Sequence, residues 1–289
     1  VLRKINPKLV YVAVSGFGTQ GPMADKPAFD HVIQGMSGLT NLQSSEDNGF
    51  DLIRTFICDK VTSYTVCQAA TAALVARATT GEGQHIDISM LHACLAFMWP
   101  DGMMHRTLKD DDKFEMSPGA DYFQTLNFSD GAVAVAALTD SHWQAVLPLI
   151  GYPELLDTPL FSSIASRMTN MKEVSLVLKN PRLDIGVETA VAALKAADVP
   201  CAPCLHQDEI ETNDQIQAID ALETYVTEAM GKLTVPRPPV QFDGATTSQA
   251  KPSPLLGEQS REVLSELGWD HASIDQLISS GDVVVTALP

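Results

Sequence analysis

A continuous apolar segment near the start of the chain, residues 9–14 (LVYVAV), constrains the fold more than any other feature. An apolar run of this length without alternation is typical of a parallel strand covered on both faces. It leads into residues 15–22 (SGFGTQGP), whose glycines allow the backbone to approach another group closely. Ligands of open α/β sheets bind at this end of the strands. The segment therefore predicts an α/β fold, with either a binding loop or a plain tight turn after the strand.

The other periodic segments agree with an α/β fold. Residues 61–77 are an Ala-rich helix that Thr80-Gly81 ends, and residues 84–90 (QHIDISM) alternate as a half-buried strand does. We also predict helices over residues 29–39, 91–98, 141–150 with a Ser cap, 208–219, 258–267 and 274–279, and a β-hairpin over 122–127 and 132–137. Residues 109–117 are charged and are predicted to be a linker.

The chain is strongly acidic, with 19 Lys and Arg against 36 Asp and Glu and a formal net charge of −17 over 289 residues. This charge argues against nucleic acid as a partner, because phosphate binding needs a basic face. No apolar run approaches the roughly 18–20 residues that a membrane span needs, so we expect no membrane association. The chain starts at Val1 and reaches a strand almost at once, which suggests a fragment of a longer protein.

The five cysteines predict a reduced, cytoplasmic protein, because their number is odd and three stand in apolar segments. Cys201 and Cys204 form a C-x-x-C motif, which needs further ligands to hold zinc. Only His206 is near, and the motif follows a helix in a Pro-rich segment. We therefore expect packing thiols in a short strand, and no metal site.

Asp59 is the candidate catalytic residue. It follows an apolar stretch, residues 52–58, and stands at the start of the helix predicted over residues 61–77. A carboxylate there accepts hydrogen bonds from the free N–H groups of the first turn and interacts with the positive end of the helix, which keeps it ionised. Two interpretations are open: a plain helix cap, or a carboxylate nucleophile at the edge of a dry pocket. The sequence contains no H-E-x-x-H, G-x-S-x-G or P-loop motif.

Four stretches of the sequence carry a resemblance to a known family. They are residues 6–22 (NPKLVYVAVSGFGTQGP), 29–38 (FDHVIQGMSG), 80–90 (TGEGQHIDISM) and 254–268 (PLLGEQSREVLSELG). In order and spacing they resemble the class III CoA-transferases, a family that also holds carnitine CoA-transferase, formyl-CoA transferase and the α-methylacyl-CoA racemases. The third stretch is the most specific, and the similarity extends from near the first residue to near the last.

The resemblance places the family's nucleophilic Asp at Asp59 and implies an enzyme. Such an enzyme moves CoA from an acyl-CoA thioester to a carboxylic acid through an aspartyl-CoA intermediate, with coenzyme A as a substrate and no cofactor. The racemases place a His directly before the Asp that matches Asp30. Here that position is Phe29, and His31 lies about 200° around the helix from it, so we favour a transferase. A racemase or epimerase stays as an alternative, and an inactive family scaffold as a second alternative.

The resemblance also implies an architecture: a Rossmann-like large domain, incomplete in this sequence, plus a smaller α/β domain, in an interlocked homodimer. We divide the chain into part of the large domain with linker helices (1–108), the small α/β domain (109–205), and a return segment with C-terminal helices on the large domain (206–289).

The resemblance further implies substrate- or CoA-binding residues. They are Gly18, Lys26, Phe29, Asp30 and Gly119. For Lys26 a solvated loop lysine is the other interpretation. Gly119 marks the place of the family's glycine-rich lid, of which only this one glycine remains.

Overall fold

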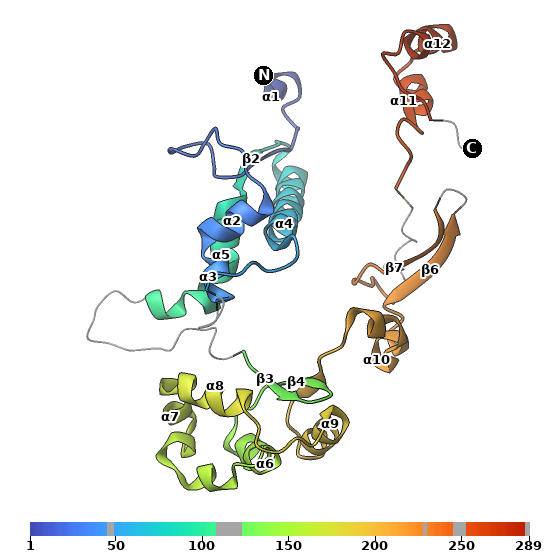
Figure 1. Ribbon diagram of the computed structural model, residues 1–289. Coiled ribbons are helices and arrows are strands. Elements are labelled where there is room, and N and C mark those ends of the chain that lie inside the picture. The colour runs from blue at the N-terminus through green and yellow to red at the C-terminus, as the bar shows by residue number, and fades with distance from the viewer. Residues whose placement is uncertain (45–48, 108–122, 228–229, 245–252, 287–289) are drawn as a thin grey trace. The chain divides into compact units, whose positions relative to one another are not determined.

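The computed structural model describes residues 1–44, 49–107, 123–227, 230–244 and 253–286. It has a mixed α/β architecture (Figure 1) and separates into two compact units, Val1–Cys204 and Leu205–Pro289. The prediction of an α/β protein is confirmed. The Rossmann-like character of the incomplete large domain, the interlocked dimer and the domain limits at residues 108 and 205 stay predictions.

The first part of the chain is built around two parallel strands that helices connect. Its elements are α1 (Leu2–Ile5), β1 (Tyr11–Ser15), α2 (Asp30–Ser37), α3 (Leu39–Leu42), α4 (Ile57–Thr80), β2 (His85–Ser89), α5 (Met90–Gly102) and the 3-10 turn η1 (Met104–Arg106). β1 and β2 pair in parallel, with Tyr11 opposite His85 and Ser15 opposite Ser89. The parallel strand is therefore confirmed, but Tyr11 and Val14 are exposed, because only two strands form this sheet among the described residues.

Two glycines bring β2 beside β1. Gly81 ends α4 as predicted, in a left-handed conformation with φ of 76°, and its N–H donates to the carbonyl of Arg77 at 2.9 Å. The N–H of Gly83 donates to the carbonyl of Pro7 at 2.8 Å. A Cβ on Gly83 would lie 2.0 Å from the carbonyl oxygen of Leu9. The backbone approach at this turn therefore leaves no room for a side chain.

A small hydrophobic core lies among the helices of this first part. Its buried members are Ile33, Leu39, Cys58, Cys94 and Met98. The helix predicted over residues 29–39 is present as α2 and α3, which Gly38 separates with φ of 89°. Around this core several large apolar side chains stay exposed, among them Phe56, Tyr64 and Phe97.

A three-stranded antiparallel sheet with helices packed against it follows. The elements are β3 (Thr125–Phe128), β4 (Gly131–Val135), α6 (Asp140–Leu149), η3 (Pro153–Asp157), η4 (Pro159–Phe161), α7 (Ile164–Thr169), α8 (Met171–Lys179), α9 (Val187–Ala196) and β5 (Cys201–Pro203). The strand order is β3-β4-β5, so the predicted hairpin is confirmed. Its core contains twelve buried residues: Leu126, Val133, Trp143, Val146, Leu147, Ile150, Phe161, Val174, Leu178, Ala190, Leu194 and Val199.

Two local predictions in this region have different outcomes. The cap of α6 is Thr139 and not Ser141: Thr139 Oγ1 accepts from the N–H of His142 at 3.3 Å, and His142 Nδ1 accepts from the N–H of Thr139. The C-x-x-C motif does lie at a short strand, with the thiols of Cys201 and Cys204 free. Within the described ranges, no group of His, Cys, Asp and Glu could hold a metal ion, and no helix is long and apolar enough to cross a bilayer.

The second unit contains a hairpin and short helices. Its elements are η5 (Gln207–Thr212), α10 (Asp214–Ala218), β6 (Leu222–Thr227), β7 (Gly231–Pro236), α11 (Ser260–Glu266) and α12 (His271–Ser279). The helix predicted over residues 208–219 is therefore split in two. β6 and β7 are antiparallel, and Arg237 after β7 forms ion pairs with Asp220 at 3.1 Å and Glu223 at 2.9 Å.

Candidate functional site

The N-terminus of α4 is capped by a residue from another helix. α4 begins at Ile57 after Phe56, whose side chain has no oxygen to accept a hydrogen bond. Asp30, the first residue of α2, is buried, and its Oδ2 accepts from the N–H groups of Cys58 at 2.7 Å and Asp59 at 3.1 Å. The expectation that Asp59 caps this helix is therefore wrong, because the carboxylate of Asp30 already holds these first-turn amides.

Gln34 ties Asp30 to the segment that leads into α4. It lies one turn after Asp30 on α2 and is also buried. Its Nε2 donates to Asp30 Oδ1 at 2.6 Å, to the carbonyl of Ile53 at 3.1 Å and to the carbonyl of Thr55 at 3.3 Å. Its Oε1 accepts from the N–H of Ile53 at 2.9 Å. Gln34 and Asp30 together fix residues 53–59.

Asp59, the predicted nucleophile, is the third residue of α4 and is exposed. Its backbone carbonyl accepts from Ser63 Oγ at 2.8 Å. Its carboxylate makes no hydrogen bond or ion pair with any residue that the structure describes. Hydrogen bonds therefore fix the backbone of Asp59, while its carboxylate oxygens have no partner within the described ranges. Its role as a nucleophile stays a prediction.

Two buried thiols lie at the same end of α4. Burial raises the pKa of Cys58, and its contact with Cys94 raises it further. Burial also raises the pKa of Cys94. The negative charges of Asp30 and Asp59 act in the same direction on both thiols. Both cysteines therefore stay protonated near neutral pH and do not compete with Asp59 as nucleophiles.

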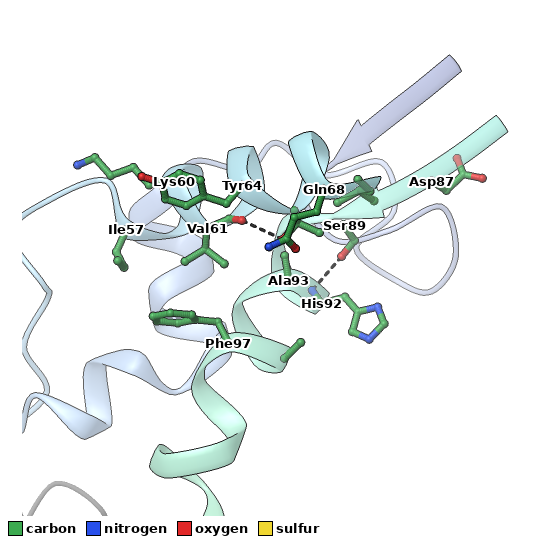
Figure 2. Close-up of a pocket in the computed structure, with 13 residues that line it drawn as sticks. Ile57, Lys60, Val61, Tyr64, Gln68, Asp87, Ser89, His92, Ala93 and Phe97 are labelled. Atoms are coloured by element: carbon green, nitrogen blue, oxygen red, sulfur yellow. Dashed lines mark hydrogen bonds between the residues drawn. The ribbon is translucent and has the colours of Figure 1, made fainter. Parts of the chain in front are cut away.

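A groove of about 700 Å³ lies between α4 and α5 (Figure 2). It is lined by Ile57, Lys60, Val61, Tyr64, Thr65 and Gln68 of α4, by Asp87, Ile88 and Ser89 of β2, and by His92, Ala93, Ala96 and Phe97 of α5. Ser89 caps α5, because its Oγ accepts from the N–H of His92 at 3.1 Å. A helix turns about 100° per residue, so Asp59 lies about 200° from Ile57 and on the other side of α4. Asp59 does not line this groove.

The other predicted binding residues lie near the ends of β1 and α2. Gly18 has φ of 96°, its N–H donates to Ser15 Oγ at 3.1 Å, and a Cβ on it would lie 3.9 Å from that of Ser89. Lys26 is an exposed loop residue, and Phe29 is exposed as the N-cap of α2. Gly119 lies outside the described residues. The contacts of these residues with a substrate stay predictions.

His31 lies closer to the start of α4 than the sequence suggests. Phe29 has an extended backbone, with φ of −134° and ψ of 164°, so the helical angle between it and His31 does not apply. The ring of His31 is edge-on to that of Phe56, with centroids 6.0 Å apart. An imidazole therefore lies at the same end of α4 as Asp59.

Several known proteins with similar sequences are CoA-transferases by name. The chain is 26% identical over 285 residues to succinyl-CoA:glutarate CoA-transferase of Mus musculus, covering 96% of this chain and 64% of that protein. It is 27% identical over 305 residues to formyl-CoA:oxalate CoA-transferase of Streptomyces coelicolor, covering 97% of this chain and 72% of that protein. The chain thus spans about two thirds of the length of these relatives.

Solved structures share the fold. A CAIB/BAIF family protein from Brucella suis superposes with a TM-score of 0.71 at 26% identity, covering 92% of this chain and 70% of that one. A Mycobacterium tuberculosis protein at 22% identity superposes with a TM-score of 0.72, covering 90% of this chain and 70% of that one. The family model described as CoA-transferase family III matches residues 1–260. The chain therefore belongs to CoA-transferase family III.

Proposed function

We propose that this chain carries the nucleophile, Asp59, of an acyl-CoA:carboxylate CoA-transferase. One observation carries the proposal. The amides at the N-terminus of α4 are bound by Asp30, while the carboxylate of Asp59 on the same turn has no hydrogen-bond partner in the part of the chain that the structure describes. A carboxylate in this state can attack a carbonyl carbon. Membership of the family and the names of the relatives support the reaction class.

The reaction proceeds by exchange of carboxylates on CoA. The Asp59 carboxylate attacks the thioester carbonyl of the donor, the C–S bond breaks, and a mixed anhydride and CoA thiolate form. The thiolate attacks the Asp59 carbonyl carbon, which releases the donor acid and leaves an aspartyl-CoA thioester. The acceptor carboxylate repeats both steps in reverse order and leaves as the new acyl-CoA, with Asp59 regenerated. Coenzyme A is a substrate throughout, and no cofactor takes part.

Such a reaction needs protection from water, because the anhydride and the aspartyl thioester both hydrolyse. Asp59 is exposed in the single chain. We therefore propose that a second subunit of an interlocked homodimer covers this end of α4. Gly18, Lys26 and Phe29, at the ends of β1 and α2, would contact the CoA ester, and Gly119 would belong to a lid.

The acceptor is proposed to be a dicarboxylic acid. The relatives' names pair succinyl-CoA with glutarate, and formyl-CoA or acetyl-CoA with oxalate. The test incubates the protein with succinyl-CoA and either glutarate or oxalate, and follows the new thioester by mass spectrometry. Hydroxylamine is added in a parallel reaction to convert an activated Asp59 carboxyl into a hydroxamate.

We expect a new acyl-CoA and a hydroxamate on Asp59, and neither product in Asp59→Ala. Asp157→Ala, which removes an exposed carboxylate at the end of η3, is the matched control and should behave as the wild type. Transfer that persists in Asp59→Ala, or a hydroxamate on another residue, would contradict the proposal.

The position of His31 favours a second candidate function, a racemase or epimerase of 2-methylacyl-CoA. Its imidazole lies beside Phe56, at the end of α4 that carries Asp59, where it could exchange a proton at the carbon next to the thioester. Incubation with an (R)-2-methylacyl-CoA in D₂O tests this function. Deuterium in the α-position without any acceptor acid would favour the racemase over the transferase.

A further inference from the structure

We propose that Asp30 is a positioning residue: its carboxylate occupies the N-terminal amides of α4 and thereby leaves the carboxylate of Asp59 free to attack. The inference rests on the proposed function of Asp59. It also replaces the substrate-binding role that the sequence suggests for Asp30, because a side chain only 2% exposed, with both oxygens bonded, does not meet a substrate.

The argument starts from competition for the same amides. A carboxylate in the first turn of a helix accepts from free N–H groups there and is stabilised by the positive helix end. Asp59 stands in that turn, so it would be expected to fold back onto these amides if they were free. They are not free, because Oδ2 of Asp30 holds the N–H groups of Cys58 at 2.7 Å and Asp59 at 3.1 Å.

Hydrogen bonds to a resting nucleophile slow its attack. In the transition state the negative charge leaves the carboxylate and moves to the thioester oxygen, so amides that hold the resting carboxylate stabilise the ground state more than the transition state. By taking these hydrogen bonds, Asp30 lowers the barrier for attack without touching the substrate. We therefore expect the loss of the Asp30 carboxylate to lower kcat and to change KM little.

Gln34 keeps Asp30 in this position. Its Nε2 donates to Oδ1 of Asp30 at 2.6 Å, while its other hydrogen bonds hold Ile53 and Thr55. Oδ1 is therefore satisfied by Gln34 and Oδ2 by the two amides, so the carboxylate cannot rotate without losing one set of partners. The arrangement fixes both the cap and the segment that precedes Asp59.

The first experiment needs no substrate. A water-soluble carbodiimide and an amine label carboxylates at a rate that follows their nucleophilic reactivity, and peptide mass spectrometry compares Asp59 with the exposed Asp157 in the same sample. We expect Asp30→Ala to lower the Asp59 to Asp157 labelling ratio at least about threefold, because Asp59 then binds the freed amides. An unchanged ratio in a folded Asp30→Ala protein overturns the proposal.

The matched control is Ser37→Ala. Ser37 is also buried on α2, and its Oγ donates to the carbonyl of Gln34 at 3.2 Å, but it contacts neither α4 nor Asp30 through a hydrogen bond. Its removal tests whether any loss of a buried polar group in α2 has the same effect. We expect the labelling ratio and kcat to stay at the wild-type values. Equal losses in Ser37→Ala and Asp30→Ala would reduce Asp30 to a structural role and overturn the proposal.

The second experiment measures transfer from succinyl-CoA. We expect Asp30→Ala to lower kcat about tenfold or more while KM stays within about twofold. Asp30→Asn keeps an oxygen for the amides but turns an NH₂ group toward Gln34, so it should recover part of kcat, and it carries the test if Asp30→Ala does not fold. A raised KM at unchanged kcat would assign Asp30 to the substrate instead.

The two proposals fail in different ways. A wild-type protein that neither transfers CoA nor gives a hydroxamate on Asp59 contradicts the proposed function, whatever the variants do. The labelling ratio of Asp59 still decides whether Asp30 frees its carboxylate. Transfer that depends on Asp59 but not on Asp30, with wild-type kcat in Asp30→Ala, leaves the proposed function standing and contradicts the positioning role.

Discussion

The part of the chain around α2, α4 and α5 and the part from β3 to β5 are held together by different interactions. Between β3 and β5, twelve buried residues form one core, and even the buried Arg167 is paired with Asp140 and the carbonyl of Phe161. Around α4 the core has five buried members, and Asp30 and Gln34 fix the candidate site through hydrogen bonds. Packing therefore dominates the stability of the later part, and directed polar contacts dominate the geometry of the earlier part.

The difference extends to the surface of the earlier part. Phe29 and Phe56, the N-cap residues of α2 and α4, and Tyr64 of α4 are between 58% and 74% exposed. Exposed large apolar side chains are typical of contact surfaces where they form a contiguous patch. The region with the candidate nucleophile thus has fewer buried core residues than the later part, and more of its large apolar side chains face outward.

The largest effect expected from this comparison is on chemistry and not on stability. Asp59→Ala should lower the transfer rate at least about 1,000-fold, or about 4 kcal/mol of activation free energy. The free energy of unfolding should change by less than about 0.5 kcal/mol, because the side chain is exposed and makes no hydrogen bond among the described residues. Steady-state kinetics and urea unfolding measure the two quantities. A large loss of unfolding free energy in Asp59→Ala would show that Asp59 also stabilises the earlier part of the chain, and would contradict this comparison of the two parts.

In the later part of the chain we expect a substitution to lower stability and to leave the transfer rate nearly unchanged. Leu147 of α6 is fully buried in the hydrophobic core of the later part. Leu147→Ala should therefore lower the free energy of unfolding by about 2–5 kcal/mol. At temperatures where the variant is folded, kcat should stay within about twofold of the wild type. Urea unfolding followed by circular dichroism gives the first value. Loss of kcat in the folded variant would show that this core also shapes the site.

A substitution at a close backbone contact in the earlier part should lower the free energy of unfolding by an intermediate amount. Gly83→Ala places a Cβ against the carbonyl oxygen of Leu9, so we expect a loss of about 1–3 kcal/mol and faster hydrogen exchange at the N–H of Tyr11, which bonds to Gln84. Gly35→Ala in α2 is the matched control, since nothing lies within 4 Å of its Cβ position. It should stabilise the protein by up to about 1 kcal/mol. Equal changes in unfolding free energy for Gly83→Ala and Gly35→Ala would contradict the close approach of Gly83 to the carbonyl of Leu9.

The smallest expected effect concerns a helix cap in the later part. Thr139→Ala removes the Oγ1 acceptor at the start of α6 and should cost about 1 kcal/mol of unfolding free energy. Ser141→Ala, at the position that the sequence suggests as the cap, should cost only a few tenths. The same urea series measures both variants. The reverse order of the two losses would assign the cap to Ser141.

The sequence predicts those elements that depend on local pattern. The alternation of residues 84–90, the helix that Gly81 ends and the hairpin of β3 and β4 depend only on neighbouring residues, and the structure contains all three. The exact starts of helices are less predictable. α4 begins two residues before Asp59, because Asp30 supplies its cap from a different helix.

The parts of the candidate site that the sequence does not reveal depend on long-range contacts. Cys58 bonds to a carboxylate 28 positions earlier, and Gln34 bonds to residues 19 and 21 positions later. No spacing rule relates such positions. The available signal is weak: Asp30 and Gln34 are two polar residues one turn apart on a helix with an apolar face.

The pairing of β1 with β2 also has a kinetic consequence. Tyr11 and His85 stand 74 positions apart, and all of α2, α3 and α4 lies between them. Closing so long a loop costs entropy before any contact is gained, and folds rich in such distant pairs form slowly. Asp30, Cys58 and Asp59 all precede β2 in the chain, so the hydrogen bonds that join α2 to the start of α4 do not depend on residues that are synthesised after them.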